Sequence, residues 1–199
     1  MFELAEYIGI IAFSMSGFFV GVRNHLDLLG VLIATFLTAL GGGIIRDIGV
    51  DKTPFTFTNT YPALIVVIVL ALLILFRFHK RNSLENKALF IWSDSIGLVS
   101  FSISGALIAI EHHFNLAGVV AMAFTTAVGG GIVRDVIINE VPFVLKTGFY
   151  GTISLLIGMT LYILAQFSLI SFSSISLLFI FAFVLRLIAY YKKWAIPLK

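Results

Sequence analysis

The chain contains no cysteine and few charged side chains. Without cysteine it can form no disulfide, and it can hold no metal or redox centre that uses cysteine ligands. Charged residues occupy 12% of its 199 positions and hydrophobic residues 60%, whereas an ordinary soluble domain has roughly 25% charged residues. So few charges cannot cover the surface of a soluble protein of this length. We therefore predict an integral membrane protein.

Basic residues are also missing from the N-terminal segment, where the first one is Arg23. Residues 1–11 contain two acidic side chains, Glu3 and Glu6, and lack the basic segment that begins a cleaved signal peptide. We expect the first apolar stretch to remain as a membrane span.

Several chemical signatures are absent as well. The four histidines do not have the spacing of metal ligands, and the sequence has no phosphate-binding loop, nucleotide fingerprint or nucleophile-base-acid arrangement. We therefore expect no enzymatic activity, no cofactor and no metal apart from ions in transit. The net charge of +3 fits basic loops beside a membrane and gives no reason to expect a nucleic acid partner.

Seven apolar stretches joined by short polar connectors make up most of the chain. Their lengths suit helices that cross roughly 30 Å of hydrocarbon, so we predict an all-α integral membrane protein with seven transmembrane helices. The longest connector, Arg77 to Lys87, is predicted to be a linker. The stretches cover residues 8–22, 28–50, 61–78, 93–110, 116–138, 147–167 and 173–191.

The distribution of Lys and Arg predicts the orientation of these helices, because cytoplasmic connectors carry more of these residues than external ones. The linker has four basic residues, and placing it in the cytoplasm puts Arg23, Lys146 and the basic C-terminus on the same side. We predict a multi-pass protein of the cell inner (plasma) membrane with its N-terminus outside and its C-terminus in the cytoplasm.

The chain contains an internal repeat with an offset of 88 residues. Between residues 8–55 and 96–143, 21 of 48 positions are identical. The motif Gly-Gly-Gly-x-x-Arg-Asp occurs at 41–47 and again at 129–135. Because each copy holds three spans, an odd number, the second copy must be inverted relative to the first.

These observations predict the domain organisation. The first three-helix repeat is expected at residues 5–80 and the second, inverted one at 93–168. A seventh helix without a counterpart is expected at 172–192, where it would cover a flank or an oligomer interface. Residues 193–199 are expected to form a cytoplasmic tail.

The repeated motif is unusual in a helix that crosses lipid. Three adjacent glycines weaken a helix by roughly 1 kcal/mol each relative to alanine, and Arg and Asp inside a span are costly. Our main hypothesis is that the glycines kink or open the second and fifth helices near the midplane, and that the charged residues line or gate a polar path. The alternative is that the glycines permit a close helix crossing and the charged side chains reach the interface. The motif residues are Gly41, Gly42, Gly43, Arg46, Asp47, Gly129, Gly130, Gly131, Arg134 and Asp135.

Hydroxyl groups near the motif are further candidates for the path. Thr38 and Thr126 precede the glycines by about one turn and can offer an oxygen to an ion. The two serines in the first helix of each copy cannot share one helical face, and we assign Ser14 and Ser102 to the path, with ordinary helix packing as the alternative. Asp94 is interpreted as a helix N-terminal cap, with a role at a cytoplasmic mouth as the alternative.

The doubled motif, together with the preceding Phe-Ser-x-Ser-Gly and Thr-Ala-x-Gly-Gly-Gly sequences, resembles the prokaryotic TRIC-type family of trimeric intracellular cation channels. That family includes bacterial relatives described as glycine transporters. The resemblance covers nearly the whole chain and implies a seven-helix protomer, a homotrimer and a potassium-permeable pore near the glycine kinks. Animal members bind acidic lipid through basic residues that have no identified match here, so the lipid partner stays open.

From these features we predict a passive channel for monovalent cations, potassium or sodium, with a pore inside each protomer. The alternative is a secondary transporter of glycine or another small zwitterion. A scaffolding membrane protein would explain the glycines but not the repeated Arg-Asp pairs. We also predict that leucine at Gly42 or Gly130 blocks ion flux while the protein still assembles.

Overall fold

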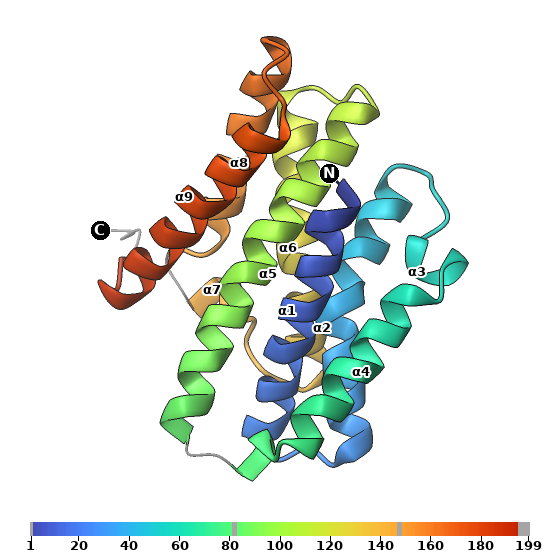
Figure 1. The fold of residues 1–199 in the computed structure, drawn as a ribbon, viewed down its shortest axis with the longest axis vertical. Helices are drawn as coiled ribbons and strands as arrows, with labels where there is room; N and C mark the ends of the chain where they lie inside the picture. Colours follow the sequence, from blue (N-terminus) through green and yellow to red (C-terminus); the bar gives the residue numbers. More distant parts are fainter. Residues whose placement is uncertain (1, 81–82, 147–148, 195–199) are drawn as a thin grey trace.

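The structure is a computed structural model that describes residues 2–80, 83–146 and 149–194 of the chain. In these ranges it consists of helices and loops without any strand (Figure 1). The α-helices are α1 Phe2–Arg23, α2 Leu28–Gly49, α3 Phe55–Thr58, α4 Tyr61–Leu75, α5 Ser83–Glu111, α6 Leu116–Ile137, α7 Phe143–Lys146, α8 Gly151–Gln166 and α9 Phe172–Tyr191, and the 3-10 helix η1 spans Phe78–Lys80.

Seven of these helices are apolar and lie where the sequence predicts membrane spans. Among the described residues, α1, α2, α5, α6 and α9 are long and apolar enough to cross a membrane, whereas α4 and α8 have only 15 and 16 residues. A 15-residue helix is about 22 Å long, which is less than the roughly 30 Å of hydrocarbon. The all-α membrane fold is confirmed, although these two helices are short.

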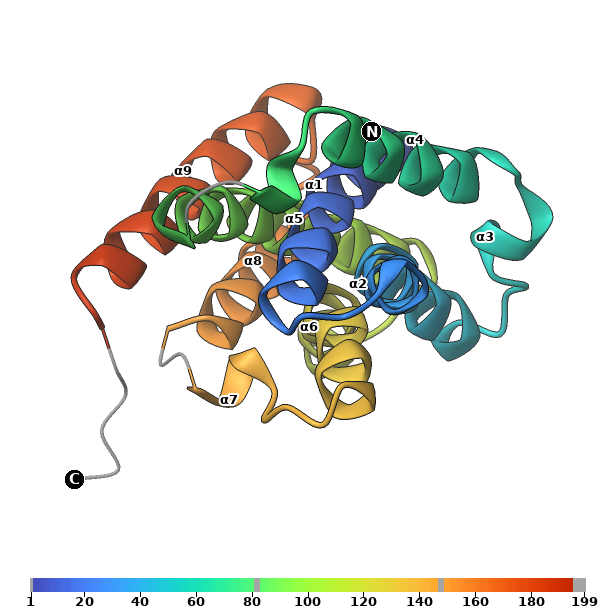
Figure 2. The same cartoon turned by 90° about the horizontal axis from the view of Figure 1, so that it is seen from below.

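Equivalent helices of the two repeats run in opposite directions. In Figure 1, α1 and α5 are antiparallel, as are α2 and α6, and the short helices α3 and α7 lie on opposite sides of the molecule. Figure 2 shows α1, α2, α5 and α6 at the centre, with α4 on one side and α8 and α9 on another. The arrangement agrees with an inverted repeat, while the limits 5–80, 93–168 and 172–192 remain predictions. The predicted tail at 193–199 lies mostly outside the described residues.

The relation between the repeats is visible in the core. Phe13 and Phe101 are equivalent positions, and their rings stack with centroids 5.3 Å apart. Gly9 and Gly97, also equivalent, leave room for these rings. A Cβ on Gly9 would stand 2.9 Å from the Phe101 ring, and one on Gly97 would overlap the Phe13 ring. The repeats therefore meet along α1 and α5, with α2 and α6 beside them.

Helices α2 and α6 have equivalent N-terminal caps. The Asp27 side chain accepts a hydrogen bond from Gly30 N at 2.7 Å, and its equivalent Asn115 accepts one from Gly118 N at 2.9 Å. Such caps satisfy backbone N–H groups that have no partner within the helix. Both helices that carry the motif therefore start at a defined residue, which sets the depth of the glycines.

Removal of one cap is expected to have a modest effect. Asp27→Ala should lower the free energy of unfolding by about 1 kcal/mol, because Gly30 N loses its side-chain acceptor. Thermal unfolding in detergent measures the change, and Asn115→Ala makes the equivalent change in the second repeat. Unaltered midpoints in both variants would mean that the caps do not contribute to stability.

Helix α5 begins earlier than the sequence predicts. It starts at Ser83 rather than at residue 93, so the predicted linker Arg77–Lys87 is partly helical. Hydropathy detects only the apolar part of a helix, whereas the polar residues after Ser83 include good helix formers that continue it. Asp94 consequently lies inside α5 and is buried. Its interpretation as an N-terminal cap is wrong.

Candidate functional site at the crossing of α2 and α6

Glycines of the repeated motif let α2 and α6 cross at very short distance. A Cβ on Gly42 would overlap the Thr126 carbonyl oxygen, and one on Gly130 would stand 2.6 Å from the Leu37 carbonyl oxygen. Gly41 also lies against the other helix, because its Cβ would be 3.0 Å from Gly130 Cα. A side chain at Gly42 or Gly130 would therefore push the two backbones apart. The close crossing that the sequence offered as the alternative is present.

Both helices stay α-helical through the glycines. Helix α2 is continuous over Leu28–Gly49 and α6 over Leu116–Ile137. The prediction that the glycines open the helices and expose backbone carbonyls is therefore wrong. The low helix propensity of glycine costs only about 1 kcal/mol per residue, and the tight packing of α2 on α6 compensates for it.

The third glycine of each motif points away from the crossing. A Cβ on Gly43 would be 3.5 Å from Glu6 Oε1 and 3.9 Å from Arg46 Nη2. A Cβ on Gly131 would be 3.8 Å from Arg134 Nη2. These are ordinary contact distances, so each position has room for a methyl group beside a charged side chain.

Arg46 is buried between the repeats and is paired. It is 0% exposed, and its guanidinium donates to Asp47 Oδ1 through Nε at 2.8 Å and to Glu6 Oε1 through Nη2 at 3.0 Å. Its Nη1 donates to Ser104 Oγ, in the other repeat, at 2.7 Å. A buried charge needs such partners because desolvation is costly. Arg46 is therefore held inside the protein and does not extend from its surface.

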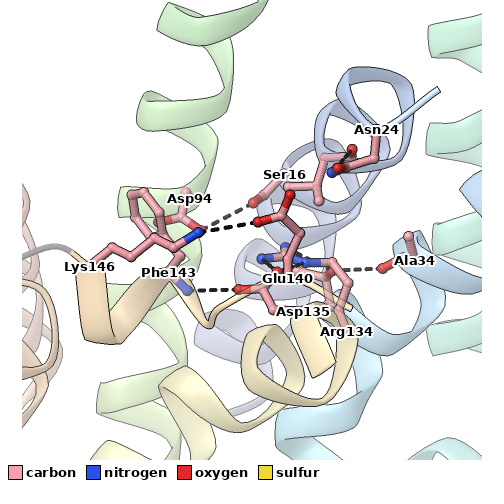
Figure 3. Close-up of polar contacts among 11 residues, drawn as sticks. Ser16, Asn24, Ala34, Asp94, Arg134, Asp135, Glu140, Phe143 and Lys146 are labelled. Carbon is pink, nitrogen blue, oxygen red and sulfur yellow. Dashed lines mark hydrogen bonds and ion pairs between the residues drawn. The ribbon is translucent and has the colours of Figure 1, made fainter. Parts of the chain in front are cut away.

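The Arg134 cluster repeats part of this pairing (Figure 3). Arg134 donates to Asp135 Oδ1 through Nε at 2.8 Å and to Thr38 Oγ1 through Nη1 at 3.1 Å. Thr38 belongs to the first repeat, so each arginine reaches from its own repeat into the other. Because each arginine is paired with the aspartate that follows it, its positive charge is balanced locally.

The second oxygen of each motif aspartate holds the loop that follows its helix. Asp47 Oδ2 accepts a hydrogen bond from Phe55 N at 2.7 Å, and Asp135 Oδ2 accepts one from Phe143 N at 2.8 Å (Figure 3). These N–H groups begin the short helices α3 and α7, each of which follows a proline. In each repeat the motif therefore links a buried charged cluster to the short helix that follows it.

The repeats differ in the acidic residue of the first helix, which is Glu6 in one and Asp94 in the other. Glu6 forms an ion pair with Arg46. Asp94 has no ion pair within the described residues and instead accepts a hydrogen bond from Ser16 Oγ at 3.1 Å (Figure 3). It is 3% exposed, and its Oδ2 has no hydrogen-bond partner in the described part of the chain.

The serines contact the charged residues in a pattern that differs from the predicted one. Ser14 Oγ and Ser102 Oγ donate to the carbonyl four residues earlier in their own helices, at 2.6 and 2.7 Å. Ser16 and Ser104 contact the charged groups instead. Helical periodicity shows that the two serines of a pair face different sides, but it does not show which side holds the charges. A role for Ser14 and Ser102 in the path stays a prediction.

The remaining candidates from the sequence are also buried. Thr38 accepts the hydrogen bond from Arg134, whereas Thr126 Oγ1 has no hydrogen-bond partner in the described ranges. Gly129 lies mainly against a side chain, since its Cβ would be 2.7 Å from Ile45 Cδ1 and 3.9 Å from Gly42 Cα. The motif residues thus share one region, but only some of them lie beside free space.

Arg186, on α9, is a buried charged residue that the sequence analysis did not single out. Its guanidinium lies over the Tyr150 ring, with Cζ 4.8 Å from the ring centroid, and its charge acts on Asp94. Its Nε and Nη2 have no hydrogen-bond partner in the described part of the chain. An arginine in an otherwise apolar span is expensive and is a functional candidate, so the sequence did contain the signal.

A small cavity lies beside the Arg134 cluster. Its volume is about 10 Å³, and Asp94, Thr38, Arg134, Asp135 and Tyr150 line it together with apolar side chains. A cavity of this size holds about one water molecule. It is therefore the place where the unpartnered oxygen of Asp94 can meet a small polar ligand.

The family model described as "Glycine transporter" matches residues 3–80 and 91–166. This chain belongs to that family. A UPF0126 membrane protein of Deinococcus radiodurans is 44% identical over 140 residues, which is 70% of this chain and 64% of that protein, so the match spans less than two thirds of the relative. The UPF0126 membrane protein YvgT of Bacillus subtilis (strain 168) is 35% identical over 197 residues, 98% of this chain and 95% of the relative.

Two solved structures of TRIC channels resemble this family member over its whole length. A TRIC cation channel studied for the structural basis of conductance has a TM-score of 0.85 and 36% identity, covering 100% of this chain and 97% of that one. A TRIC trimeric intracellular cation channel orthologue from Rhodobacter sphaeroides has a TM-score of 0.87 and 27% identity, covering 97% and 98%. The resemblance predicted from the doubled motif is confirmed.

Proposed function

We propose that this family member is a channel for monovalent cations, permeable to potassium, with a pore inside each protomer. The observation that carries the proposal is the match over the full chain to a TRIC cation channel, with 36% identity and a TM-score of 0.85. Fold similarity alone would not support an activity. The buried charged clusters at the repeat interface add the chemistry that a polar path requires.

The proposed pore runs beside Gly43 and Gly131, where a glycine instead of a larger residue leaves room next to a charged side chain. The arginines are balanced by their aspartates, so the groups left for a cation are carboxylate and hydroxyl oxygens. Gly41, Gly42 and Gly130 would serve a different purpose, because they hold α2 against α6. The cavity of about 10 Å³ is too small for a hydrated ion, so conduction requires nearby side chains to move.

The proposed assembly is a homotrimer in the inner membrane, with the N-terminus outside and the C-terminus in the cytoplasm. Similarity to a trimeric channel supports the trimer, and exposed apolar side chains on α9, such as Leu177 and Phe181, suit lipid or a neighbouring protomer. A groove of about 440 Å³ lined by Lys87 and Lys193 would accept the phosphate of a membrane lipid. The bias of Lys and Arg supports the orientation.

Single-channel recording tests the function. The purified protein in a planar bilayer is expected to give resolvable unitary currents in potassium chloride, because passive permeation is far faster than transporter turnover. Absence of unitary steps under potassium and sodium gradients would refute the channel proposal.

A variant pair tests the position of the pore. Gly43→Leu is expected to reduce unitary potassium conductance by about tenfold or more, because the side chain fills the space beside Glu6 and Arg46. Ala71→Leu places the same side chain at an exposed site on α4 and should leave the conductance unchanged. Equal currents in both variants would show that the pore does not pass beside Gly43.

The second candidate is a secondary transporter of glycine, which the description of the matching family favours. Saturable glycine uptake into liposomes, together with silence in the bilayer recordings, would support it over the channel. In that case the repeats would move relative to each other about the α2–α6 crossing, so that the glycine site opens first to one side of the membrane and then to the other.

A further inference from the structure

The Arg46 cluster and the Arg134 cluster differ in how their acidic residue is paired. The equivalent acids are Glu6 and Asp94, whose side chains differ by one methylene group. Glu6 is long enough to form an ion pair with Arg46, at 3.0 Å. Asp94 is shorter, and no such pair joins it to Arg134. Asp94 is bound through Oδ1 to Ser16, which leaves Oδ2 buried and without a hydrogen-bond partner among the described residues.

The space that Asp94 leaves is the cavity of about 10 Å³. Four oxygen-bearing side chains line it from different elements: Asp94 on α5, Thr38 on α2, Asp135 on α6 and Tyr150 at the start of α8. Thr38 Oγ1 accepts one hydrogen bond from Arg134 and keeps a second lone pair. Tyr150 interacts with Asp94 through its hydroxyl. Both carboxylate oxygens of Asp135 already accept hydrogen bonds, so the cavity offers the free carboxylate oxygen of Asp94 together with neutral hydroxyl oxygens.

The charges that line the cavity favour a cation. Asp94 and Asp135 contribute two negative charges and Arg134 one positive charge, a net charge of −1. The guanidinium of Arg134 is committed to Asp135 and Thr38. Arg186 does not line the cavity and lies over the Tyr150 ring, from where its positive charge also acts on Asp94. Among the described residues it forms no ion pair with Asp94, so the Oδ2 atom of Asp94 keeps no direct partner. A buried carboxylate without a partner is costly, and a bound cation would offset that cost.

We propose that this cavity binds one dehydrated monovalent cation, potassium or sodium, with Asp94 Oδ2 as its anionic ligand. The hydroxyls of Thr38 and Tyr150 would supply neutral oxygen ligands, which can replace the water molecules around such a cation. This inference rests on the proposed cation channel. It makes the ion path asymmetric, because Glu6, the equivalent acid in the first repeat, is already paired with Arg46. Asp94 is then the ion-binding residue of the path.

Asp94→Glu separates the effect of geometry from that of charge. The added methylene should let the carboxylate reach Arg134 as Glu6 reaches Arg46, so the charge stays but the cavity and its free oxygen are lost. Asp94→Asn removes the charge with little change in size. Glu6→Gln is the matched control, because it removes an acid at the equivalent position without altering the cavity.

Crystals of the full-length protein grown in rubidium chloride test the site, since rubidium is a potassium analogue with an anomalous X-ray signal. An anomalous peak beside Asp94 Oδ2 is expected in the wild type and in Glu6→Gln, and its loss is expected in Asp94→Glu. A wild-type cavity with water but no anomalous signal would overturn the proposal, as would a peak that persists in Asp94→Glu.

Thermal stability supplies a second measurement that needs no crystals. Potassium chloride should raise the unfolding temperature above that in equimolar choline chloride, because a ligand that binds only the folded protein stabilises it. Asp94→Asn and Asp94→Glu should lose this difference, and its retention in both would also refute the site. If the protein gives unitary currents but no ion binds beside Asp94, only the ion site is refuted. If an ion binds beside Asp94 but no unitary currents are seen, only the channel proposal is refuted.

Discussion

Leucine in place of Gly42 is expected to prevent the protomer from folding correctly, in contrast to the expectation from the sequence that this variant would still assemble. Even the Cβ of an alanine at this position would overlap the Thr126 carbonyl oxygen, which belongs to the backbone of α6 and cannot rotate away. Overpacking a tight contact usually costs about 1–3 kcal/mol and sometimes more, and here the whole crossing must separate. We expect a loss of about 3 kcal/mol or more in the free energy of unfolding.

The yield of monodisperse protein on size-exclusion chromatography and the thermal midpoint of the recovered fraction measure this effect. Gly43→Ala is the matched control, since its Cβ would be 3.5 Å or more from any neighbouring atom and the fold should persist. Gly130→Leu should resemble Gly42→Leu, because its Cβ would stand 2.6 Å from Leu37 O. A stable, monodisperse Gly42→Leu protein would show that α2 and α6 can separate without loss of the fold.

Arg46→Met is expected to destabilise the protein by about 3–5 kcal/mol. The side chain is fully buried and binds two carboxylates, those of Glu6 and Asp47. Methionine fills a similar volume but leaves both acids without their cationic partner. The penalty therefore comes mainly from the uncompensated buried charges and not from lost packing.

A double variant and a substitution in an exposed ion pair serve as controls for this prediction. Glu6→Gln combined with Arg46→Met should recover part of the lost stability, because one of the orphaned charges is removed. Lys146 and Glu140 form a pair at 3.2 Å with side chains 50% and 39% exposed, so Lys146→Met should change stability by less than about 1 kcal/mol. Equal midpoints for Arg46→Met and Lys146→Met would contradict the structural role of the buried cluster.

The membrane class, the apolar helices and the inverted repeat could be predicted from the sequence because they depend on local and periodic features. A bilayer imposes length and hydropathy on each span, and an odd number of spans per copy imposes the inversion. Helix α5 shows where this reasoning ends. Hydropathy gave its apolar part, but the polar start at Ser83 was missed because a helix continues into water without an apolar signal.

The candidate site was predicted in composition but not in arrangement. The repeated motif identified Arg46, Arg134 and the glycines, and the structure brings them to one interface. The assumption that three glycines break a helix failed, because propensity is a weak term that helix packing overrides. Arg186 was missed, although a charge in the middle of an apolar span was visible.

The amino-acid sequence by itself determined that this protein is a bundle of membrane helices in two inverted copies. Hydrophobicity can be recognised within a single segment, and the repeat can be recognised by comparing two segments, so neither needs a known contact. Only the tertiary structure decided that Gly42 and Gly130 hold two helices together while Gly43 and Gly131 lie away from the crossing, beside the buried arginines. It also decided that Glu6 is paired while Asp94 keeps an unpartnered oxygen. These properties depend on distances between residues far apart in the chain, which no local pattern encodes.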